Sequence, residues 1–238
     1  MKKILYNIAL ILAAIAAAAF IGLTARDSGD GRPEHDAQTI TASVRTVPTL
    51  IIDAGHGGMD SGAVSDSGTR ESDINLDIAQ RLDMLMGFLG VNTVMTRDSD
   101  DLAYSERANT IRQKKVEDTR RRVDLINSTE NAVLISIHQN KYPSGDPFGA
   151  QVLYARTPGS QELAKSMQAL LISSLNPRSY RVAAPIPGSV YMMNNIKPTA
   201  LLIECGFLSN SEEEALLKTP EYRLKIAATI AAGFLRYI

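Results

Sequence analysis

The sequence has one cysteine and three histidines among 238 residues, and this scarcity limits the chemistry open to it. The single thiol, Cys205, excludes an intramolecular disulfide and a thiolate cluster around a metal. Any metal would therefore have to be held by histidine and carboxylate side chains. Cys205 is also a poor candidate nucleophile, because no histidine is left over to activate it.

The chain has little excess of charge of either sign, with a formal net charge of −1. Leaving out residues 1–28 removes three Lys/Arg and one Asp, so that 22 basic and 25 acidic residues remain. A nucleic-acid-binding protein usually has a strongly basic surface. We therefore expect no nucleic-acid partner.

The first residues do not resemble part of a globular domain. Lys2 and Lys3 precede an almost uninterrupted apolar run over residues 4–23, close to the roughly 20 residues that span a bilayer. We expect residues 1–26 to be a signal peptide or a membrane anchor, and the length of the run favours the anchor. The positive-inside rule then puts the rest of the protein outside the cytoplasm, on the outer face of a bacterial membrane or in the cell-wall space.

Residues 27–47 are mostly small and polar, which predicts a flexible tether in which His35 has no function. Residues 48–238 are then the compact part, long enough for a single core. Strand-like runs occur at 49–53, 91–97, 132–138, 150–154, 190–193 and 200–204, and helical periodicity occurs at 74–89, 163–175 and 222–234. This alternation predicts a single α/β domain with a mostly parallel, twisted sheet of about six strands and helices on both faces.

Four polar residues fall where such a sheet binds ligands. His56, His138 and Glu204 each follow an apolar strand-like run, and Glu71 opens a predicted helix. Two histidines and one glutamate form an established zinc set, which leaves Glu204 as a candidate proton shuttle. Taken one at a time, each residue has an ordinary structural explanation, such as a hydrogen-bonded strand end or a glutamate in the first turn of a helix.

Two further features have more than one interpretation. The glycine-rich segment around His56 could hold a phosphate, but it lacks the Lys-Ser/Thr of a P-loop. Charges of both signs crowd residues 106–124, which suits a solvated helix face or a docking surface for a partner or an anionic polymer.

Together these residues resemble the zinc-dependent N-acetylmuramoyl-L-alanine amidases of bacterial cell walls. The matching pieces are IIDAGHGGMDSGA (51–63), the glutamate of RESDINL (70–76), TRDSD (96–100), LISIHQN (134–140) and LLIECGFLSN (201–210). The resemblance implies that His56, Glu71 and His138 bind Zn²⁺ and that Glu204 is the catalytic carboxylate. It also implies hydrolysis of the amide bond between the lactyl group of N-acetylmuramic acid and L-alanine, in peptidoglycan strands that carry stem peptides. The family commonly has His-Ala-Asn where this chain has HQN, a departure that spares the ligand.

Within the family, the chain is most similar to the spore-cortex, germination-specific amidases, through its apolar N-terminal segment and through residues 114–128 and 185–210. This similarity implies a role in forming muramic δ-lactam in the cortex. The spacing between motifs leaves no room for a long inhibitory insertion, and no wall-binding repeats follow, so we expect control by a separate partner protein. The alternatives are a vegetative or division amidase, and a non-catalytic wall-binding or scaffolding protein on the same fold.

Overall fold

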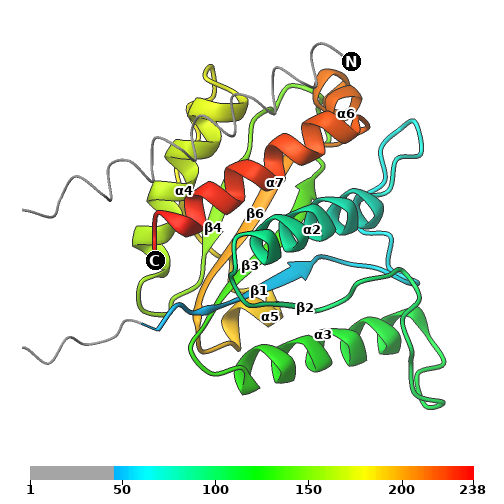
Figure 1. Ribbon diagram of the computed structural model, residues 1–238. Coiled ribbons are helices and arrows are strands. Elements are labelled where there is room, and N and C mark those ends of the chain that lie inside the picture. The colour runs from blue at the N-terminus through cyan, green and yellow to red at the C-terminus, as the bar shows by residue number, and fades with distance from the viewer. Residues whose placement is uncertain (1–45) are drawn as a thin grey trace, which may run out of the picture. The chain divides into compact units, whose positions relative to one another are not determined.

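The computed structural model describes residues 46–238, which form one α/β domain around a single sheet (Figure 1). The predicted anchor or signal (1–26), most of the predicted tether (27–47) and His35 lie outside the described residues. Among the helices that are described, none has the length and apolarity needed to cross a bilayer.

The sheet has six strands in the order β2-β1-β3-β6-β4-β5. The strands are β1 (Thr49–Ala54), β2 (Thr93–Met95), β3 (Ala132–Asn140), β4 (Gln151–Tyr154), β5 (Ala184–Pro185) and β6 (Thr199–Phe207). The helices are α2 (Glu71–Phe88), α3 (Ile111–Ser128), α4 (Ser160–Leu175), α5 (Tyr191–Asn194), α6 (Ser211–Leu217) and α7 (Pro220–Leu235). Strands β2, β1, β3 and β6 are parallel to one another, whereas β4 pairs antiparallel with β6. The predicted mostly parallel sheet of about six strands is confirmed.

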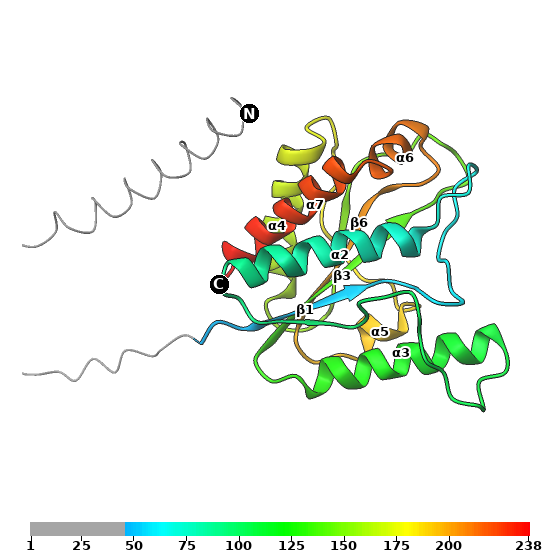
Figure 2. The same cartoon turned by 45° about the vertical axis from the view of Figure 1, so that its right-hand side comes forward.

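Helices cover both faces of the sheet, as predicted (Figures 1 and 2). Alternate residues of a strand point to opposite faces, so Leu50 and Ile52 of β1 belong to the larger core cluster, which also contains apolar residues of α2, α4 and α7. Ile51 belongs instead to a smaller cluster with Val123 of α3 and Met193 of α5. The central strands are therefore apolar on both sides, which explains their continuous apolar runs in the sequence.

One predicted strand, residues 190–193, is wrong, because this segment forms the short helix α5. A turn precedes the helix, with the Val190 amide donating to the Pro187 carbonyl at 3.1 Å. Met192 and Met193 of this helix are buried in the smaller cluster. An apolar run this short has no periodicity that separates a strand from one helical turn. The sheet ends instead at the two-residue strand β5.

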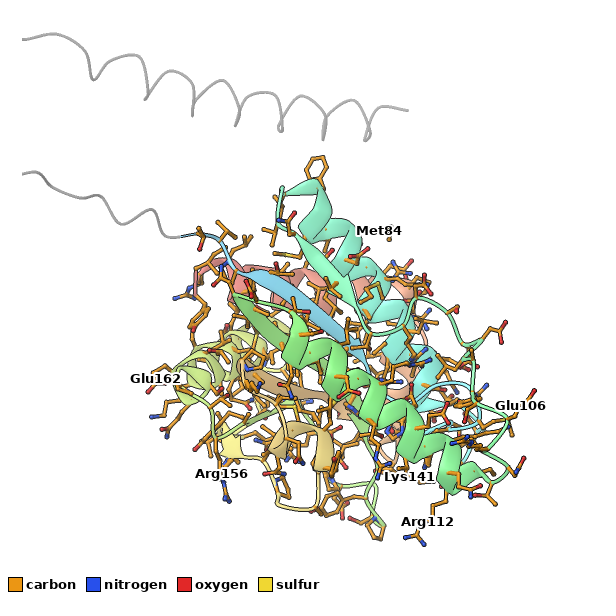
Figure 3. All side chains as sticks on the ribbon, turned by 90° about the horizontal axis from the view of Figure 1, so that it is seen from below. Met84, Glu106, Arg112, Lys141, Arg156 and Glu162 are labelled. Carbon is orange, nitrogen blue, oxygen red and sulfur yellow. The ribbon has the colours of Figure 1, made fainter. Side chains whose placement is uncertain are left out.

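Most of the charged segment forms the solvated helix α3, which begins with a capping box made by Thr110 and Gln113. Arg112 extends away from the first turn into solvent, as does Glu106 in the preceding loop (Figure 3). The prediction of a solvated face is wrong for Arg122, whose side chain is only 5% exposed.

Candidate metal centre

The loop after β1 carries His56 in an unusual backbone conformation. His56 has a φ of 61°, in the left-handed region that non-glycine residues rarely adopt. Gly57 and Asp60 close the loop with reciprocal backbone hydrogen bonds of 2.8 and 3.0 Å. This turn directs the His56 ring toward α2 and β3 rather than along the strand, and Nδ1 of the ring lies 2.8 Å from Oδ2 of Asp60.

Two buried arginines hold the carbonyl groups at the end of β1. Arg122 of α3 donates to the carbonyls of Ala54 and His56 at 2.7 and 2.6 Å. Arg97, just after β2, donates to those of Ala54 and Gly55 at 2.8 and 3.1 Å. Sequence reasoning missed both side chains. The only available signal was the place of Arg97 in the TRDSD motif, because Arg122 looks like its exposed neighbours.

The charge of Arg122 is balanced by two carboxylates. Arg122 donates to Asp53 at 2.8 Å and, through Nε, to Asp118 at 2.8 Å. Asp53 also accepts from the hydroxyls of Ser136 and Thr96, at 2.5 and 2.7 Å. Burial alone would raise the pKa of Asp53, but Arg122 and the two hydroxyl donors lower it to about 2. Asp53 and Arg122 therefore form an ionised pair, and almost all of their polar atoms have hydrogen-bond partners.

The three predicted ligands meet at the carboxyl ends of the strands. One ligand atom from each of His56, Glu71 and His138 can be chosen so that all lie within 4.8 Å of one another. Oε1 of Glu71 is 3.3 Å from Nε2 of His56 and 2.9 Å from Nδ1 of His138. The two rings meet edge to face with centroids 4.9 Å apart. The expectation that these residues share one rim is confirmed.

Close approach at this centre requires glycine at two positions. The His138 ring lies against Gly55, where a Cβ would come within 2.3 Å of Nε2 and Cε1. A Cβ on Gly62 would come within 2.5 Å of Oε2 of Glu71, and Gly62 has a φ of +66°. These close contacts explain why the loop motif has glycine at both positions.

Glu71 is fixed in its ionised form. Its carboxylate accepts from the backbone amides of Ala63 and Gln139 at 2.8 and 3.0 Å. Burial opposes ionisation, but hydrogen bonds from His138 and His56 hold the pKa of Glu71 well below its usual range. Burial would lower the pKa of His56, yet the carboxylates of Asp60 and Glu71 raise it to about 9. Two imidazoles and one carboxylate that converge in this way are the donors that a small divalent cation uses.

Glu204 faces the same centre from β6, in register with His138 of β3. Both side chains line a cavity of about 360 Å³ between the sheet, α3 and α5. Oε2 of Glu204 is buried and has no hydrogen-bond partner among the described residues. Burial raises the pKa of Glu204 to about 7. The neighbouring Cys205 packs into the core on the opposite face, where burial raises its pKa, which excludes it as a nucleophile here.

Comparison with known proteins agrees with this geometry. The model of the family described as N-acetylmuramoyl-L-alanine amidase matches residues 50–236. The chain belongs to this amidase family. A curated relative of the amidase, the germination-specific N-acetylmuramoyl-L-alanine amidase of Bacillus subtilis, is 39% identical over 189 residues, which cover 79% of this chain and 78% of the relative. The N-acetylmuramoyl-L-alanine amidase LytC of the same species is 31% identical over 192 residues, which cover 79% of this chain but 35% of LytC.

Solved structures give the same result for the amidase fold. The CwlD amidase from Clostridioides difficile, determined in complex with the GerS lipoprotein, has a TM-score of 0.76 and 36% identity to this chain. That match covers 80% of this chain and 98% of the other. The predicted function is confirmed: the protein is an amidase that hydrolyses the bond between N-acetylmuramoyl and L-alanine.

The arginine contacts of the amidase predict that replacing two adjacent arginines changes the free energy of unfolding by different amounts. Replacing Arg122 with Met should lower the free energy of unfolding by about 3–5 kcal/mol, because Asp53 is left as an unpaired buried charge. Arg121→Met is the matched control, and it should cost about 0–1 kcal/mol, because Arg121 is exposed and pairs with Asp118 at the surface. Urea unfolding followed by circular dichroism suits the chain, which has no tryptophan. Equal losses in the two variants would contradict the assigned role of Arg122.

Proposed function

We propose that this amidase is zinc-dependent, with His56, Glu71 and His138 as zinc ligands and Glu204 as the catalytic acid–base. The observation that carries the proposal is the convergence of three donor atoms within 4.8 Å. The buried, unpartnered oxygen of Glu204 beside them supports it further. Two histidines and one glutamate are an established catalytic zinc set that leaves a coordination position open.

A bound zinc ion would polarise the carbonyl under attack and make a water molecule acidic. The chain itself must then move a proton, and Glu204 suits this task. As a carboxylate it takes the proton from the attacking water, and as an acid it gives that proton to the departing nitrogen of L-alanine. A pKa of about 7 lets Glu204 exist in both forms near neutral pH.

Metal content is the first test of the proposal. The purified protein should hold about one zinc ion, and His56→Ala or His138→Ala should lose most of it, because three protein ligands are needed for tight binding. Elemental analysis of freshly purified, unchelated protein measures the stoichiometry. The proposed centre would be contradicted if the purified protein held no metal above background, or if both variants held as much zinc as the parent.

Glu204→Gln tests the proton shuttle separately from the metal. This variant should keep its zinc and its fold but lose about 10² to 10⁴-fold in turnover, the typical contribution of a general acid–base group. The assay is mass spectrometry of the stem peptides released from purified peptidoglycan. Turnover near that of the parent would make Glu204 structural and require another proton carrier.

The proposal extends to where and when the enzyme acts. We assign it to the outer side of a bacterial membrane, on the strength of the apolar run in residues 4–23. A spore-cortex role is favoured over a vegetative one, because a relative with 39% identity over most of both chains bears the name germination-specific. The relative CwlD has been determined in complex with the GerS lipoprotein, which supports control of this enzyme by a separate partner. The solvated face of α3 is the proposed docking surface, without the buried Arg122.

The cortex role can be tested by complementation. Expression in a Bacillus subtilis strain that lacks its germination-specific amidase should restore muramic δ-lactam to the spore cortex, as measured by muropeptide mass spectrometry. Glu204→Gln is the matched control and should restore none. Failure to restore the lactam by a protein that is exported and cleaves vegetative peptidoglycan would favour the vegetative alternative.

A further inference from the structure

The two histidines of the centre differ in what their outward ring nitrogens contact. Nε2 of His56 faces Glu71, while its Nδ1 lies 2.8 Å from Oδ2 of Asp60. His138 faces Glu71 through Nδ1, and its Nε2 edge lies against Gly55. Among the described residues, a carboxylate is therefore hydrogen-bonded to the outward ring nitrogen of His56 but not to that of His138.

An ionised carboxylate can only accept hydrogen bonds, so Asp60 requires a hydrogen on Nδ1 of His56. In a neutral imidazole the hydrogen is then absent from Nε2, and the lone pair of Nε2 points toward Glu71 and is free for a cation. Orientation matters more for His56 than for His138. His56 sits in a loop at a φ of 61°, whereas His138 is part of the central strand β3.

Asp60 is itself held from several directions. Its Oδ1 lies 2.8 Å from Nζ of Lys115 on α3 and accepts from the amide of Gly62 at 3.1 Å. With its backbone also bonded to Gly57 in both directions, Asp60 is a rigid acceptor that is paired with Lys115.

We propose that Asp60 is the positioning residue of the metal centre, fixing the tautomer and orientation of His56, and that Lys115 of α3 keeps Asp60 in place. Carboxylates behind a ligating histidine typically contribute about 10 to 100-fold to metal affinity. The inference rests on the proposed zinc ligands. It assigns no catalytic step to Asp60, which acts through His56.

Zinc affinity of the purified full-length protein, measured by competition with a chromophoric chelator, is the primary test. Asp60→Ala should weaken zinc binding by about 10 to 100-fold. Asp60→Asn keeps the shape and an acceptor oxygen, so it should weaken binding less, and Lys115→Met should weaken it least. Asp66→Asn is the matched control, because Asp66 is 97% exposed in a neighbouring loop and pairs with Lys141. Its zinc affinity should equal that of the parent.

A spectroscopic readout separates positioning from a general structural role. In zinc-loaded protein with ¹⁵N-labelled histidine, the parent should show a hydrogen-bonded Nδ1 proton on His56 that exchanges slowly with water. Asp60→Ala should lose this signal, while its unfolding midpoint in the presence of chelator stays within the range of the control variant.

Three results overturn the inference about Asp60. They are parental zinc affinity in Asp60→Ala, slow exchange of the Nδ1 proton of His56 that persists without Asp60, and losses of zinc affinity that merely follow a loss of stability in the zinc-free variants. A parent that binds no zinc would instead overturn the proposed zinc site, so the two failures can be distinguished.

Discussion

The structure depends on how the backbone carbonyl groups at the end of β1 are provided with hydrogen-bond donors. Buried carbonyls must accept hydrogen bonds, and Ala54, Gly55 and His56 lie where the chain leaves the sheet. Arg97 and Arg122 supply the donors. A left-handed His56 persists only because its surroundings fix it, and these guanidinium groups are a large part of those surroundings.

This solution has consequences for the rest of the domain. A buried arginine needs a buried counterion, which Asp53 provides from within the central strand β1. Arg122 reaches the loop from α3, which packs along one face of the sheet and also forms one wall of the cavity (Figure 1). Helix α3 is therefore held to the sheet both by the smaller core cluster and by the polar contacts of Arg122. These contacts fix the cavity wall and the loop of His56 together.

The parts of this architecture that could be predicted are those that short segments of the sequence determine by themselves. Apolar runs marked the central strands, and polar residues at their ends marked His56, His138 and Glu204, because parallel strands bring their carboxyl ends to one edge. Arg122 and Asp60 could not be found this way. Arg122 has the composition of an exposed helix face, and the role of Asp60 depends on a contact with α3, more than 50 residues further along the chain. The strand prediction for the segment that forms α5 failed for a related reason, since the conformation of this segment is set by a preceding turn and by burial of two methionines.

The two glutamates at the centre illustrate how position divides their chemistry. Glu71 accepts hydrogen bonds from two backbone amides and contacts both histidines. It therefore stays ionised and is suited to be a metal ligand. Glu204 is a few residues from the end of its strand, one of its oxygens has no hydrogen-bond partner among the described residues, and burial raises its pKa to about 7. Environments that push the pKa values of neighbouring carboxyl groups apart are typical of sites where one is a fixed charge and the other exchanges a proton. Exchanging the two environments, rather than the two side chains, would be needed to exchange their roles, because both residues are already glutamate.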